Sequence, residues 1–231
     1  ALGLSINRKH KNLKRVCTSQ EFRTKIRANK LLIKPNKPLG TPQGSAISAF
    51  LSNIYMLEFD INMKNLLSKI NETTHLVLLD GLGVAYIDKL EPKDMPYRMN
   101  TYIGKRNPLY STAVGKIMLA YNYKDNLEEI WAGFDLKPYT ENTIISIDKM
   151  KEELDIILKN GYSYDNEEQE LDIICIAVPI FNNSGTVNYA LSVSVPKNRF
   201  TPEKEAIILE SLLETAGNIS KNLGYLSPLS S

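Results

Sequence analysis

Residues Leu171–Pro196, LDIICIAVPIFNNSGTVNYALSVSVP, decide the fold of the larger part of the chain. Two apolar, β-branched runs flank the turn-forming cluster Asn182–Gly185, a pattern that predicts an antiparallel hairpin. The first run is almost continuously apolar, as in a strand covered on both faces. The second run alternates, so Ser192 and Ser194 point to the same side of their strand. Together with Cys175 on the partner strand, these hydroxyl groups are expected to form the polar floor of an apolar pocket.

The composition is that of a globular protein. The chain has 231 residues, of which 43% are hydrophobic and 23% charged, enough for one large domain or two smaller ones. No uninterrupted apolar run approaches the roughly 20 residues of a membrane span, and no apolar stretch follows the N-terminal charges as in a secretory signal. The two cysteines, Cys17 and Cys175, indicate no disulfide framework. We therefore expect a cytoplasmic protein with reduced thiols and no membrane partner.

The net charge of +2 hides a strong asymmetry. Residues Ala1–Lys37 contain eleven Lys or Arg and one acid, Glu21, whereas the rest of the chain carries 17 basic and 25 acidic residues. Such a basic segment is suited to non-specific nucleic-acid binding, although a solvated basic surface has the same composition. The candidate nucleic-acid contacts in this segment are Arg8, Lys9, Lys11, Lys14 and Arg15.

Periodicity and turn signals predict the other elements. The basic segment has weak periodicity and is interpreted as mainly helical, with one or two short helices and a strand over 30–33. After it, the sequence predicts strands over Thr73–Asp80, Val84–Lys89 and Tyr97–Ile103, a helix opening over Thr112–Ala120, an amphipathic helix over Ile145–Asn160 ended by Gly161, and a final helix from Pro202 to about Asn222 capped by Thr201. Strands in hairpins with two long helices describe an α+β domain with an antiparallel sheet.

Residues Gly40–Asp60, GTPQGSAISAFLSNIYMLEFD, form a glycine- and proline-containing loop that feeds a helix, with Ser45 as its expected N-cap. This string resembles the Pro-Gln-Gly block of bacterial reverse transcriptases, particularly those of retrons, group II introns and phage-defence systems. The resemblance covers about residues 23–60. In that family the loop lies beside the template and the incoming nucleotide, which adds Gln43 and Gly44 to the candidate nucleic-acid contacts.

The carboxylates of a polymerase are absent from the sequence. Two-metal catalysis needs clustered acidic side chains, and this chain has no Asp-Asp pair and no Asp before Asp60. We therefore expect a catalytically incomplete segment whose loop and helix merely pack. A fragment of an RNA-directed DNA polymerase remains the alternative interpretation, and a primer-extension assay would distinguish the two.

Four further motifs occur in order along the rest of the chain: Glu72–Glu91 (ETTHLVLLDGLGVAYIDKLE), Gly104–Ala120 (GKRNPLYSTAVGKIMLA), Gly161–Glu168 (GYSYDNEE), and CIAVPI with ALSVSVP in the opening hairpin. Over about residues 63–226 they resemble the effector-binding domain of IclR-type transcriptional regulators. The resemblance implies a GAF-like fold, with a central antiparallel sheet flanked by helices, that binds a small effector, often a carboxylate, and forms homo-oligomers. We accordingly divide the chain into a basic segment, 1–62, and an effector-binding domain, 63–231.

The same resemblance implies the position of the effector site. Its contacts would come from the start of a helix, from an acidic residue, and from the two strands of the hairpin, which correspond to Thr112, Ala113, Val114, Asp165, Cys175, Ser192 and Ser194. These groups include several neutral donors and no full positive charge, as suits reversible sensing. Each also has a simpler interpretation: Cys175 as a core thiol, Ser192 and Ser194 as an outward polar face, and Asp165 as a solvated acid. The sequence departs from the family at Leu171-Asp172, where Pro-Gly is common.

The remaining chemistry is sparse. The histidines, His10 and His75, and the cysteines lack the spacing of metal ligands, and no nucleophile-elbow motif supports hydrolytic catalysis. The sequence is therefore interpreted as a sensing domain without catalytic residues, metal or cofactor. IclR-type regulators carry a winged helix-turn-helix ahead of this domain, whereas here the basic segment occupies that place, so sequence-specific DNA binding is not carried over.

Overall fold

The computed structural model describes residues 4–7, 12–15, 59–94, 97 and 99–226, and the chain divides into two compact units, Ala1–Phe59 and Asp60–Ser231. In the first unit, β1 (Leu4–Asn7) and β2 (Asn12–Arg15) pair antiparallel, with Leu4 opposite Arg15. These residues were expected to be mainly helical, and that expectation is wrong for them. A hairpin pairs the backbone groups directly, without the periodic apolar face that a helix needs and that this segment lacks.

Most of the predicted nucleic-acid contacts lie outside the described residues. These are Arg8, Lys9, Lys11, Gln43 and Gly44, and almost all of the reverse-transcriptase-like block lies outside as well. Lys14 and Arg15 belong to β2. The prediction that this segment binds nucleic acid therefore stays a prediction.

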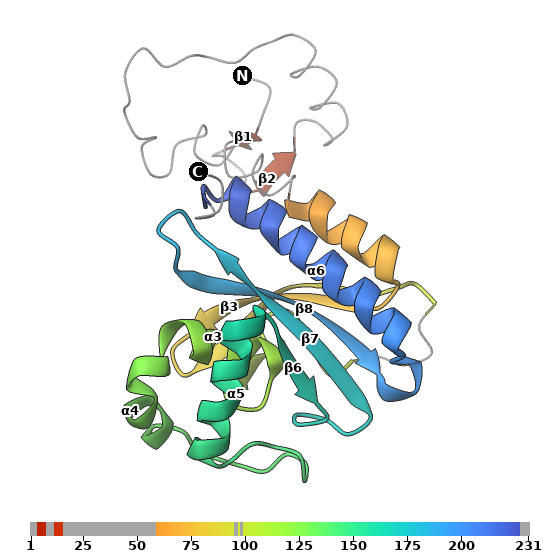
Figure 1. Cartoon of the computed structure of the whole chain (residues 1–231). Helices are drawn as coiled ribbons and strands as arrows, with labels where there is room; N and C mark the ends of the chain where they lie inside the picture. The colour runs from red at the N-terminus through yellow and green to blue at the C-terminus, as the bar shows by residue number, and fades with distance from the viewer. Residues whose placement is uncertain (1–3, 8–11, 16–58, 95–96, 98, 227–231) are drawn as a thin grey trace. The chain divides into compact units, whose positions relative to one another are not determined.

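The second unit is built on a six-stranded antiparallel sheet with the order β5-β4-β3-β8-β7-β6 (Figure 1). Its strands are β3 (Thr73–Asp80), β4 (Gly83–Leu90), β5 (Arg106–Pro108), β6 (Ser163–Asn166), β7 (Ile173–Phe181) and β8 (Val187–Pro196). The predicted hairpin β7–β8 lies at the centre, where both strands are buried along most of their length. Cys175 is paired with Ser194 in this hairpin, and Ala177 with Ser192.

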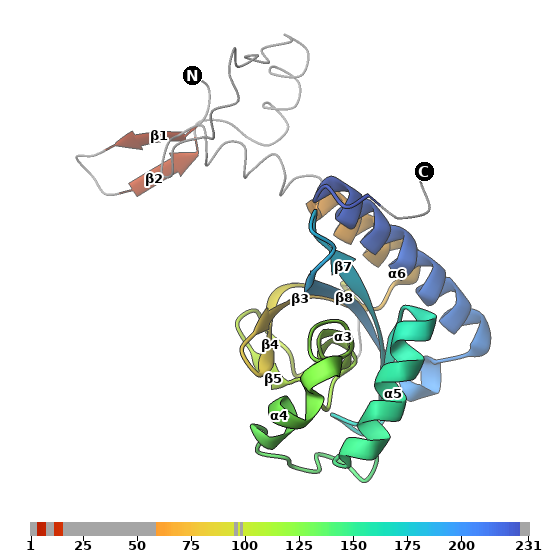
Figure 2. The same cartoon turned by 60° about the vertical axis from the view of Figure 1, so that its left-hand side comes forward.

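Helices cover both faces of the sheet. α3 (Ala113–Asn122), α4 (Leu127–Ala132) and α5 (Ile147–Asn160) lie on one face, and α6 (Pro202–Asn222) lies on the other beside a helix over residues 59–70 (Figures 1 and 2). An ion pair between Lys69 and Glu214 links these last two helices. The second unit is therefore an α+β domain with an antiparallel core sheet, as predicted.

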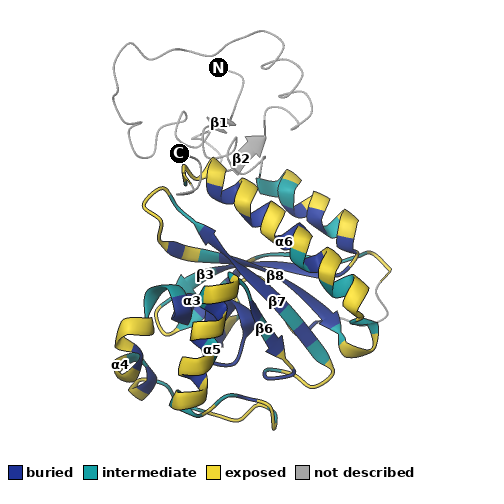
Figure 3. Ribbon diagram, viewed as in Figure 1, coloured by how far each residue is buried: buried dark blue, intermediate teal, exposed yellow. Residues whose placement is uncertain are grey.

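Each face of the sheet has its own apolar core. The first joins Ala177 and Ala190 of the central hairpin to buried side chains of α3 and α5, such as Ile117 and Leu154. The alternate strand residues are also buried and face the other way, because strand side chains have a period of two. Figure 3 shows the result, with the strands mostly buried and the exposed residues mainly on the outer sides of the helices, in the loops and at a few strand positions.

The helix ends follow the capping signals in the sequence. Gly161 ends α5 with φ of 80°, a left-handed conformation that glycine adopts without strain. The Thr201 side chain accepts a hydrogen bond from the Lys204 N–H at the start of α6, and Pro202 follows it. In the same way, Thr112 caps α3 by accepting from the Gly115 N–H at 3.0 Å.

One predicted strand is wrong. In the described part of Tyr97–Ile103 the chain forms a loop, and the strand β5 begins only at Arg106. The loop is held by a side chain instead of a backbone ladder, because Lys89 Nζ donates to the carbonyl groups of Met99 and Thr101 at 3.2 and 2.7 Å. The short elements β6 and α4 were not predicted.

Candidate ligand-binding site

A cavity of ≈ 230 Å³ lies between the sheet and the start of α3. Residues from five strands, the α3 N-terminus and two loops line it: Tyr86, Met99, Asn100, Thr101, Lys105, Asn107, Thr112, Ala113, Val114, Asp165, Gln169, Glu170, Ile173, Cys175, Ser192 and Ser194. The structure thus brings all seven predicted effector contacts to one cavity, although they come from four separate elements. That these residues contact a ligand stays a prediction.

The start of α3 gives the cavity a positive end. In the first turn of a helix the peptide N–H groups, here those of Ala113 and Val114, have no partner within the helix, and the helix dipole adds partial positive charge. Ser163 donates a hydrogen bond to the Ala113 carbonyl at 2.6 Å and so ties this turn to β6. The first turn of α3 also packs closely on the backbone of Leu109. This packing needs a glycine at position 115, because a Cβ there would lie 2.2 Å from the Leu109 carbonyl oxygen.

The strands supply the polar floor of the cavity. Asp165 on β6 is paired with Cys175 on β7, which is paired in turn with Ser194 on β8, so the three form one row across the sheet. Cys175 Sγ lies 3.1 Å from Ser194 Oγ. Burial raises the pKa of the Cys175 thiol well above its ordinary value, and the negative charge of Asp165 raises it further. The thiol is therefore neutral near pH 7, and it acts as a weak polar group and not as a nucleophile.

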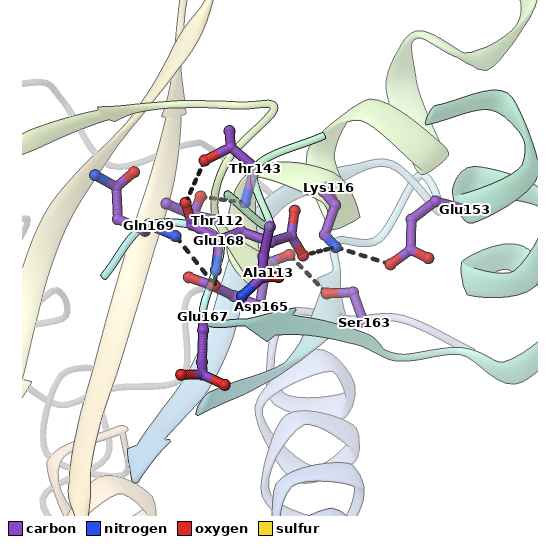
Figure 4. A network of polar contacts seen from close by, with 12 residues as sticks. Thr112, Ala113, Lys116, Thr143, Glu153, Ser163, Asp165, Glu167, Glu168 and Gln169 are labelled. Carbon is purple, nitrogen blue, oxygen red and sulfur yellow. Dashed lines mark hydrogen bonds and ion pairs between the residues drawn. The ribbon is translucent and has the colours of Figure 1, made fainter. Parts of the chain in front are cut away.

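Asp165 is a buried acid whose environment disfavours its charge. Burial raises its pKa to about 7, and the nearby charge of Glu168 contributes to the rise. One carboxyl oxygen, Oδ1, accepts hydrogen bonds from the backbone N–H groups of Glu168 and Gln169 at 2.7 and 3.3 Å, which opposes this rise. Figure 4 shows Asp165 within the polar network that continues to Glu168 and Lys116.

Lys116 lies behind the cavity wall and holds this network together. It is 1% exposed and forms ion pairs with Glu153 of α5, at 2.8 Å, and with Glu168 (Figure 4). Burial alone would lower its pKa, but the charges of Glu168 and Glu153 outweigh that effect, and the pKa is raised. Lys116 is therefore a cation committed to two carboxylates, and it does not line the cavity.

The sequence did not predict the contribution of the loop before β5. Met99, Asn100, Thr101 and Lys105 from this loop line the cavity. Lys105 corrects the expectation that the site carries no full positive charge. Its Nζ donates to the carbonyl of Asn100, and both residues line the cavity. No local pattern marked Lys105, because the fold of the loop alone brings it there.

His75 contacts the same loop from the neighbouring strand β3. It is buried on β3, its Nε2 lies 2.8 Å from Thr101 Oγ1, and its ring packs edge-on against Tyr86. Burial lowers the pKa of His75 to about 3, and the charge of Lys89 contributes, so the ring is neutral at physiological pH. His75 is thus a packed residue that lies next to the cavity lining and not within it.

The departure from the family at Leu171-Asp172 has a local explanation. Asp172 adopts φ of 63°, the left-handed conformation that a glycine at this position would reach without strain. The turn is held by its backbone: the Asp172 carbonyl accepts from the Lys197 N–H at 2.7 Å, and its N–H donates to Glu167 Oε2 at 3.0 Å. The turn therefore forms without glycine and leaves the cavity-lining strand β7 in register.

Metal sites and membrane spans are not found in the part of the chain that the structure describes. Over those residues no group of three or more His, Cys, Asp or Glu side chains is placed to hold a metal ion. Within the same ranges, none of the helices combines the length and the apolar character needed to cross a membrane.

A small, partly open cavity lined by several polar residues is typical of a small-molecule-binding domain. The family described as "Bacterial transcriptional regulator IclR C-terminal" matches residues 52–221 of this sequence. The chain belongs to this family and contains its effector-binding domain. The match begins inside the stretch that resembles a reverse transcriptase, and that second resemblance stays a prediction.

Related proteins agree with this assignment. The HTH-type transcriptional regulator KdgR of Escherichia coli is 42% identical over 168 residues, which make up 72% of this chain and 63% of KdgR. The DNA-binding transcriptional repressor YiaJ of the same organism is 40% identical over 141 residues, 60% of this chain and 50% of that protein. The chain thus spans less than two thirds of the length of these relatives.

Solved structures show the same fold. The crystal structure of the C-terminal domain of E. coli KdgR has a TM-score of 0.67 at 39% identity, covering 74% of this chain and 99% of that one. The inducer-binding domain of PobR from Acinetobacter, in a double mutant complexed with 3-hydroxybenzoic acid, has a TM-score of 0.63 at 28% identity, covering 71% and 94%. The predicted α+β architecture is therefore confirmed.

Proposed function

We propose that the second unit senses a small organic acid, which binds in the cavity beneath α3 and alters the activity of a transcriptional regulator. One observation carries the proposal. The start of α3, which carries N–H groups without a partner in the helix, lines the same cavity as Lys105, Ser192 and Ser194. Donors and positive charge from different sides suit a carboxylate ligand.

The size of the cavity limits the ligand. Pockets for drug-sized molecules have volumes of about 300–1,000 Å³, whereas this cavity measures ≈ 230 Å³. A small metabolite fits better than a nucleotide or a peptide. Tyr86, Met99 and Ile173 supply apolar surface for a short carbon skeleton, while the polar groups fix its orientation. The complex of the PobR inducer-binding domain with 3-hydroxybenzoic acid, an aromatic carboxylic acid, supports this ligand class.

The activity of the whole protein is part of the proposal. By analogy with the named relatives, the regulator would act on transcription. The resemblance to IclR-type regulators extends the proposal to a cytoplasmic homo-oligomer that acts by sensing and not by catalysis. The basic segment offers a second, separate function, non-specific nucleic-acid binding, which the eleven cations of Ala1–Lys37 favour. Affinity for DNA or RNA that falls steeply with salt would identify that function.

A thermal-shift screen of the full chain tests the sensing function. The panel would contain gluconate, galacturonate, lactate and 3-hydroxybenzoate, each compared with its uncharged amide or alcohol. An acid present at about 100 times its Kd should stabilise the folded state by roughly 2.7 kcal/mol. The proposal predicts stabilisation by at least one acid and a smaller effect of its uncharged analogue. Equal effects of acid and analogue, or no effect of any acid, would contradict it.

A further inference from the structure

Beside the cavity lie four buried or partly buried ionisable side chains, in which the acids outnumber the cation. Lys116 is the cation, and Glu153, Glu168 and Asp165 are the acids (Figure 4). The ion pairs found among the described residues join Lys116 to both glutamates and leave Asp165 without a cation. If all four groups were ionised, the network would carry two excess negative charges, and of the three acids only Glu153 is partly exposed to water. Such an arrangement is costly, and a proton on one acid relieves it.

The two oxygens of Asp165 have different surroundings. Oδ1 accepts the N–H groups of Glu168 and Gln169, whereas Oδ2 takes part in none of the hydrogen bonds found among the described residues. Asp165 lines the cavity, and Glu168 does not. The pKa of Glu168 is also raised by burial, and its Oε2 has no hydrogen-bond partner among the described residues, but a proton placed there would not reach a ligand in the cavity. A proton on Asp165 Oδ2, in contrast, could be donated in a hydrogen bond to a ligand.

The charge of Lys116 lowers the pKa of Asp165 but does not outweigh burial and the charge of Glu168. The remaining groups around Asp165 do not neutralise it. Across the sheet, the Cys175 thiol and the Tyr86 phenol have raised pKa values and are neutral near pH 7. Glu170, from the loop after β6, lines the cavity and is a further acid, and Lys105, from the loop before β5, is the cation of the lining. An incoming carboxylate would satisfy Lys105 and the α3 N–H groups, but an ionised Asp165 would repel it.

We propose that Asp165 takes part in ligand binding as a neutral carboxylic acid, so that the cavity takes up an organic acid and one proton together. The proton comes from solvent and resides on Oδ2, which donates a hydrogen bond to an oxygen of the ligand, while Oδ1 keeps its two N–H donors. The inference rests on the sensing function proposed above. It makes Asp165 a determinant of specificity that favours ligands with an acceptor oxygen at this end. A pKa of about 7 for Asp165 supports it.

Calorimetric titration of the full chain with 3-hydroxybenzoate and with gluconate tests the coupling. Each titration is run at pH 5.5 and pH 8.0, in two buffers of different ionisation enthalpy, which reveals the number of protons taken up. At pH 8.0 we expect uptake of about one proton per acid bound and a Kd about tenfold weaker than at pH 5.5, where uptake should be close to zero. Asp165→Asn keeps Oδ1 and cannot ionise, so it should bind equally at both pH values without proton uptake.

The control is Asp155→Asn, which changes an exposed acid of α5 that pairs with Lys124 and should leave proton uptake as in the wild type. Binding without proton uptake, with equal affinity at the two pH values, would overturn the coupling but leave the sensing function in place. The coupling is likewise overturned if Asp165→Asn weakens binding at both pH values. Failure of both acids to bind at either pH would overturn both proposals. Should Asp165→Asn not fold, the wild-type proton count alone decides.

Discussion

Cys175 and Ser194 face each other across the central hairpin, with Sγ 3.1 Å from Oγ, and Ser194 and Ser192 line the same cavity. Two polar side chains make this contact between β7 and β8, at positions where a purely structural core would carry apolar side chains. The hairpin therefore lines one side of the cavity with polar groups, and the first turn of α3 lines another side with polar groups.

The serines are expected to serve binding more than stability. Ser192→Ala combined with Ser194→Ala removes one observed side-chain hydrogen bond, which costs about 1 kcal/mol of folding stability, and should abolish the thermal shift caused by an acid. Denaturant unfolding and the acid screen measure the two effects. Ser211→Ala is the control, because Ser211 is equally buried, bonds the Ile207 carbonyl and lies on α6 away from the cavity. An unchanged acid shift in the double variant would place the site elsewhere.

Lys105 is expected to recognise the charge of the ligand. Lys105→Gln should weaken binding of 3-hydroxybenzoate by about tenfold, because a charge-assisted hydrogen bond is worth roughly 1.5–3 kcal/mol, and should leave binding of 3-hydroxybenzamide unchanged. Arg106→Gln is the neighbouring control, since Arg106 forms an exposed pair with Asp80 and does not line the cavity. Equal losses for the acid and its amide would show that Lys105 acts on the shape of the loop and not on charge.

Two helical glycines are expected to respond to alanine in opposite ways. Gly115→Ala would place Cβ within 2.2 Å of the Leu109 carbonyl oxygen, so α3 must shift, and we expect a loss of stability of about 3 kcal/mol or more together with loss of acid binding. Gly217→Ala in α6 meets no atom within 4 Å and should stabilise the chain by about 0.5–1 kcal/mol. Urea unfolding distinguishes them. Similar effects of both changes would refute the close packing of α3 on Leu109.

The pH dependence of stability should carry the signature of Asp165. Its pKa is about 7 in the folded chain against an ordinary 3.8, so between these values the folded state holds a proton that the unfolded state lacks. Stability from this group is therefore complete below pH 4 and is lost as pH rises to 7, by up to about 1.4 kcal/mol per pH unit. Asp165→Asn should lack this slope in urea titrations from pH 4.5 to 8. Parallel profiles for the two proteins would mean that Asp165 is ionised throughout.

Local signals were sufficient for most of the domain. The turn cluster Asn182–Gly185 predicted the hairpin, and Gly161 and Thr201 marked the ends of two helices, because caps and turns depend on a few neighbouring residues. Tyr97–Ile103 has the composition of a strand, but its described residues form a loop. A lysine that only the folded chain brings close, Lys89, holds this loop.

The candidate site shows the same limit. Its helix start and strand residues followed from a resemblance, since each belongs to a compact motif. Lys105 did not, because a loop places it. The ion pair of Lys116 with Glu168, which sets the environment of Asp165, joins segments far apart in the sequence, and no spacing rule indicates it. Charge balance inside a cavity is a property of the tertiary structure.

The most direct test of the account is to observe where an acid binds. Amide chemical shifts of the labelled full chain would be followed during titration with 3-hydroxybenzoate and gluconate. We predict saturable shifts concentrated at Ala113 and Val114 and at the strand residues Cys175, Ser192 and Ser194, absent in the double serine variant. Shifts confined to the basic segment, or no saturable shifts in the second unit, would contradict the claim that the cavity beneath α3 is an organic-acid site.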